Sequence, residues 1–201
     1  MEHLLREMEA YALLHHVPII NVNGKAALVE TVTAKRPHRV LEIGTAIGYS
    51  SLLIAENSAD DIQITTLELN EERAATAKRF IDQSKYSEKI TVLLGDAADN
   101  IDALQDIYDL VFIDAAKGQY LTYFNKILPH LAVDGVVVAD NVLFRGYVRS
   151  EEKPPRRYKT IVTRLRKYIE TVENHPEFET VIHEQGDGLA VSYRRKNIEK
   201  T

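Results

Sequence analysis

The 201-residue sequence contains no cysteine and no tryptophan. Without cysteine, the chain forms no disulfide bonds, no thiolate zinc site and no cysteine nucleophile. No apolar run approaches the roughly 20 residues that a membrane-spanning helix needs. The first residues also lack the basic and apolar regions of a signal peptide. We therefore expect a cytoplasmic protein that makes no contact with membranes.

Acidic residues outnumber basic ones, and the formal net charge is −5. This charge argues against non-specific nucleic-acid binding by the whole surface, but it leaves room for a local basic patch. No repeat, low-complexity tract or long linker interrupts the chain. Because 201 residues with 45% hydrophobic content suffice for one substantial core, we predict a single domain over residues 1–201.

Short apolar runs alternate with segments of helical periodicity along the chain. Helices are expected at about residues 4–12, 24–34, 50–56, 71–83, 119–131 and 160–172. Strands are expected at residues 39–43, 62–67, 90–94, 109–113, 135–139, 179–183 and 189–193. This alternation predicts an α/β fold, a doubly wound and mostly parallel sheet with helices on both faces. Gly186-Asp187-Gly188 between the last two runs indicates an antiparallel hairpin at the C-terminal end.

Ligands of such sheets bind beyond the carboxyl ends of the strands, so the residues after each strand are the first candidates. Gly44 and Gly48 follow the first strand, with Ala46 between them. A dinucleotide site would need a further glycine for the pyrophosphate, so a ligand without phosphates fits better. A turn that binds no ligand is the alternative. Glu68, after the second strand, suits the two hydroxyls of a ribose, although an acid there also suits NAD or a helix start.

Asp96 follows the third strand, where an acid can accept from an adenine amino group or simply form a turn. Asp114 follows the fourth strand, and Asp140 and Asn141 follow the fifth. If these strands are neighbours, the last three side chains converge. Two carboxylates and an amide oxygen form a hard ligand set that suits Mg²⁺ or Ca²⁺ and leaves coordination positions open. Helix capping is the alternative for each residue taken singly.

Three motifs are LEIGTAIGYS at residues 41–50, FIDAAK at 112–117 and DNV at 140–142. Together they resemble the catechol/caffeoyl-CoA O-methyltransferase family, and the resemblance covers nearly the whole chain. Within that family the sequence looks most like the bacterial tRNA 5-hydroxyuridine methyltransferases. The motifs that suggest this are HHVPI at residues 15–19, KGQY at 117–120, NVLFRG at 141–146, NHP at 174–176 and GDGLA at 186–190.

The resemblance implies a Rossmann-like, seven-stranded fold that binds S-adenosylmethionine (SAM), and a homodimer. It places the methionine end of the cofactor against Glu42, Gly44, Thr45, Gly48 and Ser50. The ribose would lie at Glu68 and the adenine at Asp96 and Ala97, and Asp114 would also contact the cofactor. Ile19 and Ile20 would close over the cofactor as part of N-terminal helices in residues 1–36. Asp114, Asp140 and Asn141 would hold Mg²⁺ or another hard divalent cation, and Lys117 would lie beside the reacting hydroxyl.

A lysine at this place is a candidate general base, and a direct ion pair with Asp114 is the competing interpretation. Tyr120 either lines the substrate pocket or makes an ordinary core contact. Ala116 stands where the mammalian catechol enzyme has a tryptophan, which indicates a wider site. A basic stretch follows the metal ligands: Arg145, Arg149, Lys153, Arg156, Arg157, Lys159, Arg164, Arg166 and Lys167.

Phosphate contacts from this stretch, with Arg145, Arg156 and Arg157 as the candidates, favour 5-hydroxyuridine in tRNA as the acceptor. A small catechol-like or CoA-linked phenol is the alternative acceptor, since CoA also attracts basic residues. A solvated charged surface is the remaining interpretation of the stretch. Two further hypotheses fit less well: an NAD-dependent oxidoreductase and a non-catalytic RNA-binding module. Neither accounts for Lys117 together with the candidate metal ligands.

Overall fold

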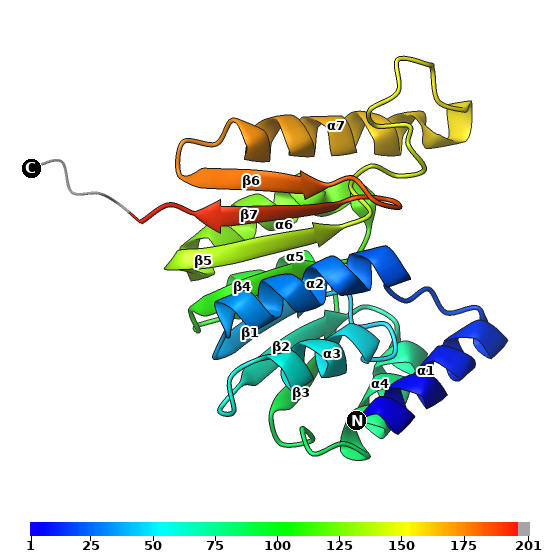
Figure 1. Ribbon diagram of the computed structural model, residues 1–201, viewed down its shortest axis with the longest axis vertical. Helices are drawn as coiled ribbons and strands as arrows, with labels where there is room; N and C mark the ends of the chain where they lie inside the picture. Colours follow the sequence, from blue (N-terminus) through cyan, green and yellow to red (C-terminus); the bar gives the residue numbers. More distant parts are fainter. Residues whose placement is uncertain (197–201) are drawn as a thin grey trace, which may run out of the picture.

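Seven strands form one sheet in the order β3-β2-β1-β4-β5-β7-β6 in the computed structural model, which describes residues 1–196 (Figure 1). Strands β1 to β5 run parallel, and β7 is antiparallel to both β5 and β6. The seven-stranded, mostly parallel sheet and its terminal hairpin are therefore confirmed. The strands span β1 Arg39–Ile43, β2 Gln63–Glu68, β3 Ile90–Leu94, β4 Tyr108–Ile113, β5 Leu131–Asp140, β6 Phe178–His183 and β7 Leu189–Arg194.

Helices cover both faces of this sheet because the strands alternate the direction of their apolar side chains. Val40 of β1 packs into the core beneath α1 to α4, whereas Leu41 packs into the core beneath α5 to α7. The helices span α1 Glu2–His15, α2 Val22–Lys35, α3 Tyr49–Asn57, α4 Glu71–Asp82, α5 Ala97–Ala103, α6 Tyr120–Ile127 and α7 Lys159–Glu173, with short 3₁₀ turns η1 Lys117–Gln119, η2 Leu128–His130 and η3 Arg156–Tyr158.

Two expectations about these elements were wrong. The helix expected up to residue 131 ends at Ile127, because Pro129 in η2 has no N–H to continue it, and β5 begins at Leu131 rather than at Gly135. Helix α5 was not expected at all. It has only seven residues, too few for a visible period, and begins where the Asp96 side chain accepts from the N–H of Ala98.

The terminal hairpin supports the loop that follows β5. The N–H of Val142 donates to the carbonyl of Gly188 over 3.0 Å, and the N–H of Leu143 donates to that of Asp187 over 2.8 Å. The Asp187 carboxylate also accepts from the N–H of Arg145 at 2.9 Å. Gly188 has a φ of +77°, and a Cβ there would lie 2.3 Å from the Leu143 side chain. The hairpin therefore fixes the backbone around Asn141, one of the candidate metal ligands.

A polar cluster at α1, α2 and α3 holds the N-terminal helices in place. The ammonium of Lys25 donates to the Tyr49 hydroxyl at 2.6 Å and to the Glu9 carboxylate at 3.1 Å, and Tyr49 also donates to Glu9. Because Tyr49 begins α3 directly after Gly48, the cluster ties α1 and α2 to the glycine turn. No helix within residues 1–196 combines the length and apolarity that crossing a membrane would require.

Candidate functional site

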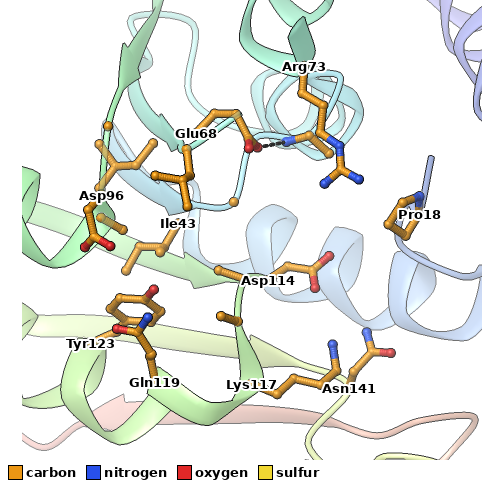
Figure 2. A pocket seen from close by; sticks show the side chains of 18 of the residues that line it. Pro18, Ile43, Glu68, Arg73, Asp96, Asp114, Lys117, Gln119, Tyr123 and Asn141 are labelled. Carbon is orange, nitrogen blue, oxygen red and sulfur yellow. Dashed lines mark hydrogen bonds between the residues drawn. The ribbon is translucent and has the colours of Figure 1, made fainter. Parts of the chain in front are cut away.

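A cleft of about 340 Å³ opens at the carboxyl ends of the parallel strands. It lies where β1 and β4 are neighbours and the strand order reverses, the place where ligands of doubly wound sheets bind. Eight of the residues singled out in the sequence line it: Ile19, Gly44, Glu68, Asp96, Ala97, Asp114, Lys117 and Asn141. Figure 2 shows Asp96 and Tyr123 at one end of the cleft and Pro18 at the other, with Glu68 and Asp114 between them.

The glycine turn packs tightly against the neighbouring strand ends. Gly44 has a φ of +106°, and a Cβ there would lie 2.1 Å from the carbonyl oxygen of Asp114, so no other residue fits. The N–H groups of Gly44 and Thr45 donate to the Leu67 carbonyl, at 2.9 and 3.2 Å. The N–H of Ala46 donates to the Glu68 carboxylate at 2.8 Å. These bonds hold the turn against the end of β2.

Glu68 forms the wall of the cleft between the two ends. One carboxylate oxygen accepts from Ala46 N–H and the other from the N–H of Asn70, at 2.9 Å. Two backbone donors thus fix the carboxylate, and each oxygen keeps a lone pair for a further donor. This arrangement is suited to the hydroxyl pair of a ribose, as the sequence suggested.

Several residues expected to touch the cofactor lie beneath the cleft instead of on its wall. The carboxylate of Glu42 is fully buried and accepts from the hydroxyls of Ser50, Ser51 and Thr66. Burial raises the pKa of Glu42 to about 7, against the effect of the three hydroxyl donors. Thr45 likewise bonds the Thr66 hydroxyl at 2.6 Å. Gly48 and Ile20 are also absent from the cleft wall.

Of the three candidate metal ligands, Asp114 and Asn141 line the cleft, whereas Asp140 is buried behind its wall. One carboxylate oxygen of Asp140 accepts from the N–H of Asn141 at 2.8 Å, and the other is buried without a hydrogen bond to any residue within 1–196. Burial, and next the charge of Asp114, raises the pKa of Asp140 to about 7. Burial also raises the pKa of Asp114, although the charge of Lys117 opposes this rise. A divalent cation would satisfy a buried carboxylate oxygen that has no hydrogen bond and feels the charge of a second carboxylate.

The protein supplies few ligands to such an ion. Within residues 1–196, no group of three or more His, Cys, Asp and Glu side chains is placed to hold a metal. The expected set has only two carboxylates, and its third member is the amide of Asn141, whose backbone is left-handed with a φ of +58°. About half of an octahedral coordination sphere would therefore come from water or from the acceptor.

Lys117 begins η1 and reaches the cleft from the turn after β4. Figure 2 shows the side chains of Asp114, Lys117 and Asn141 converging there. Within the described part of the chain, Lys117 forms no ion pair within 4.0 Å, so the direct pair with Asp114 that competed with the base role is not observed. Its ammonium is left facing the cleft.

Tyr120 is a core residue and does not line the cleft. It is 1% exposed, and its hydroxyl donates to the backbone carbonyl of Asp140 at 2.9 Å. Of the two alternatives for Tyr120, the structure shows the core contact. The positions of this segment that face the cleft are instead Gln119 and Tyr123. The site residues expected from the sequence include neither of them, nor Pro18, Leu69 and Arg73, which lie next to or a few residues beyond the expected positions.

The basic stretch divides into structural and exposed parts. Arg166 donates to the carbonyls of Tyr147, Val148 and Ser150, and Arg149 pairs with Glu173, so these two stabilise the loop after β5. Arg145, Arg156 and Arg157 lie outside the cleft wall.

Arg145 and Arg157 form an exposed cluster with aromatic rings. Their guanidinium carbons lie 5.4 and 4.6 Å from the centre of the Tyr158 ring. Phe144 and Tyr147 pack beside the same ring. We call Phe144, Arg145, Tyr147, Arg157 and Tyr158 the Arg–Tyr cluster. It begins three residues after Asn141 in the chain, and so lies on the segment that leaves the cleft.

Comparison with known proteins places these features in a family. The sequence pattern described as O-methyltransferase matches residues 3–195. Caffeoyl-CoA O-methyltransferase 5 of Nicotiana tabacum is 29% identical over 178 residues, which are 83% of this chain and 72% of the tobacco protein. Tapetum-specific methyltransferase 1 of Arabidopsis thaliana is 26% identical over 183 residues, 89% of this chain and 77% of the relative.

Solved structures agree with these sequence matches. A Staphylococcus aureus protein named as a caffeoyl-CoA O-methyltransferase candidate is 31% identical, with a TM-score of 0.87 over 94% of this chain and 91% of that one. An O-methyltransferase from Bacillus cereus, solved with S-adenosylhomocysteine, has a TM-score of 0.83 at 23% identity over 96% of this chain and 91% of that one, a likeness of fold.

Proposed function

Because the chain belongs to this O-methyltransferase family and is therefore a SAM-dependent O-methyltransferase, we propose that it methylates a hydroxyl oxygen held by a divalent metal ion at Asp114, Asp140 and Asn141. The observation that carries the proposal is the buried oxygen of Asp140, which has no hydrogen-bond partner among residues 1–196 and feels the charge of the Asp114 carboxylate. Bound there, Mg²⁺ would stabilise the oxyanion form of the acceptor hydroxyl and orient it.

The residues of the chain have separate tasks in this reaction. The methyl carbon leaves the sulfonium sulfur and bonds to the acceptor oxygen, so the sulfur becomes a neutral thioether and the hydroxyl proton must leave. Lys117, in its unprotonated form, would take that proton, because it lines the cleft next to Asp114 and is held in no ion pair within the described residues. Glu68, with both oxygens fixed by backbone N–H groups, would hold the cofactor ribose.

A direct test of the metal is methyl transfer from labelled SAM, measured with Mg²⁺ and with EDTA for the wild type and Asp140→Ala. We expect transfer to be lost in EDTA and to fall at least 100-fold in Asp140→Ala. Binding of Mn²⁺ to the cofactor-free protein, followed by electron paramagnetic resonance, gives a second readout that needs no acceptor. Undiminished transfer in EDTA would refute the metal site but leave the methyltransferase activity intact.

We propose a phenolic acceptor, small or carried on CoA, as the first class to test. Support comes from the relatives, several of which are named caffeoyl-CoA O-methyltransferases. The cleft has room next to Lys117, since the position before it is the small residue Ala116, which lines the wall.

A second acceptor, 5-hydroxyuridine in tRNA, is favoured by the Arg–Tyr cluster. Guanidinium groups within 5.4 and 4.6 Å of a tyrosine ring centre are suited to phosphates and bases of a polynucleotide. The segment that carries the cluster begins at the candidate metal ligands, so a bound strand would run past the reacting group. The positive charge of this cluster is opposite in sign to the net charge of the chain, which is −5.

One experiment separates the two acceptors. Labelled methyl transfer is compared on caffeoyl-CoA, free caffeate and tRNA that contains 5-hydroxyuridine, using the wild type and the double variant Arg145→Gln/Arg157→Gln. If tRNA is the acceptor, the double variant loses at least tenfold in kcat/KM on tRNA, and the loss shrinks at high salt. Transfer to the phenols alone would refute tRNA. The control is Lys78→Gln/Lys167→Gln, which removes two exposed positive charges outside the cluster.

A further inference from the structure

The cleft contains one cation for which the proposed function has no task. Arg73 lies in the first turn of α4, where the Asn70 side chain caps the helix by accepting the N–H of Arg73 at 2.9 Å. Its side chain lines the cleft, and Figure 2 shows it reaching toward the end where Pro18 lies, away from Asp96 and Tyr123. Within residues 1–196, no carboxylate lies within 4.0 Å of its guanidinium.

The methionine end of SAM needs a partner for its carboxylate, and the two turn residues on the cleft wall have no free N–H to offer. The turn residues on the cleft wall are Gly44 and Ala46. Their N–H groups already donate to the Leu67 carbonyl and to Glu68. Residues 47–51, which lead into α3 and form its start, do not line the cleft. The N–H groups of the turn that lie on the cleft wall are therefore not available to an anion.

Side chains beneath the turn are committed as well. Ser50, which the family resemblance assigns to the methionine end, donates its hydroxyl to Glu42 below the floor of the cleft. Glu42 is an acid and repels a carboxylate. Two positive side chains line the described cleft wall, Lys117 and Arg73. Lys117 lies at the candidate metal ligands, on the acceptor side, which leaves Arg73 for the cofactor.

We propose that Arg73 binds the carboxylate of the methionine moiety of the cofactor. The inference rests on the proposed use of SAM and adds a cofactor contact to it. The cofactor would then lie with its adenine at Asp96 and its ribose at Glu68, and its carboxylate would reach the Arg73 end of the cleft. The guanidinium presents paired N–H donors that match a carboxylate, which a lysine does not.

The test compares two ligands that differ only in this group. Calorimetry measures the Kd of S-adenosylhomocysteine and of its decarboxylated analogue, which keeps the adenosine, the sulfur and the amine. We expect Arg73→Gln to weaken S-adenosylhomocysteine roughly tenfold and to leave the analogue within twofold of wild type. Arg73→Lys should recover part of the loss. The control is Lys78→Gln, which removes an exposed charge from the same helix and should change neither Kd.

Each other outcome has a definite meaning. Equal weakening of both ligands by Arg73→Gln would overturn the proposal, because the arginine would then act on the adenosine or on the fold. Unchanged binding of S-adenosylhomocysteine, with a raised KM for the acceptor, would overturn it in favour of an acceptor contact. A wild-type protein that does not bind S-adenosylhomocysteine at all would refute the use of SAM itself, which is a separate failure.

Discussion

The hydroxyl of Tyr120 donates a hydrogen bond to the backbone carbonyl of Asp140 across 2.9 Å, and both residues are buried. This contact joins the start of α6 to the end of β5, where the candidate metal ligands lie. The ring of Tyr168 meets that of Tyr120 edge to face, with 5.7 Å between ring centres. The Tyr168 hydroxyl is equally buried but has no hydrogen-bond partner among residues 1–196. The two tyrosines are thus equally buried, but only the Tyr120 hydroxyl holds the backbone at the candidate metal ligands.

We predict that Tyr120→Phe lowers the free energy of unfolding by about 1–2 kcal/mol, because it leaves the Asp140 carbonyl buried and unsatisfied. Mn²⁺ affinity should fall severalfold, since the end of β5 is then held less firmly. Tyr168→Phe should be neutral or stabilising and leave metal affinity unchanged. Urea denaturation and Mn²⁺ titration check both variants, and equal effects of the two substitutions would show that Tyr120 has no positioning role.

The buried carboxyl of Glu42 predicts a loss of stability at high pH. Burial raises its pKa from 4.5 to about 7. Between these values the folded chain keeps a proton that the unfolded chain releases, so stability falls as pH rises through this window and levels off above it. The effect is at most about 3 kcal/mol, at 1.36 kcal/mol per pKa unit.

We predict that Glu42→Gln removes this part of the pH dependence, so that the variant gains on the wild type as pH rises from 5 to 8. Urea denaturation at four pH values in EDTA measures it. The comparison of variant with wild type cancels the contributions of Asp114 and Asp140, which are present in both proteins. Parallel pH profiles for the two proteins would contradict the prediction.

Metal binding should strengthen with pH for a related reason. The pKa of Asp140 is raised to about 7 and that of Asp114 is also raised, mainly by burial in both cases. Protons therefore compete with the cation below about pH 7. We expect Mn²⁺ affinity to rise about tenfold from pH 6 to pH 8 and to be lost in Asp140→Asn at both. Asp99→Asn, which changes an exposed carboxylate of α5, serves as the control. A flat affinity profile would place the ion elsewhere.

Gly188→Ala should disturb the loop that carries Asn141. An added Cβ would lie 2.3 Å from Leu143, and the φ of +77° is unfavourable for alanine. We expect a loss of about 2–4 kcal/mol in stability, together with weaker metal binding. Gly146→Ala has a similar φ of +75° but no atom within 4 Å, so backbone strain alone should cost about 1 kcal/mol. Thermal and urea denaturation compare the two, and similar losses would show that the Leu143 contact does not matter.

The fold was predictable because its strands are short apolar runs that follow the period of the sheet. Polar residues after these strands likewise indicated where the cleft lies, since the sheet geometry brings Glu68, Asp96, Asp114 and Asn141 to one edge. The direction of a side chain was harder to predict. Leu41 packs on the opposite face of β1 from Val40, and the same alternation turns Glu42 under the turn rather than into the cleft.

Arg73 and Tyr120 show what a motif search leaves out. Arg73 faces the cleft because Asn70 caps the helix and so sets the direction of its first turn. That capping signal was present in the sequence: Asn70 stands two residues after Glu68 and three residues before Arg73. Tyr120 lies within a conspicuous motif but points away from the cleft, because η1 turns the chain before α6 begins. Both placements depend on local backbone geometry that residue spacing does not determine.

The order of the strands has a consequence for the nascent chain. Strand β5 gains its second neighbour only from β7, and the backbone after Asp140 is held by Asp187 and Gly188 near the end of the described residues. During synthesis, β5 leaves the ribosome with an unpaired edge, and the loop bearing Asn141 stays without its support until the last strand emerges. The cofactor half of the cleft can form early, whereas the half that would hold the metal and the acceptor matures last.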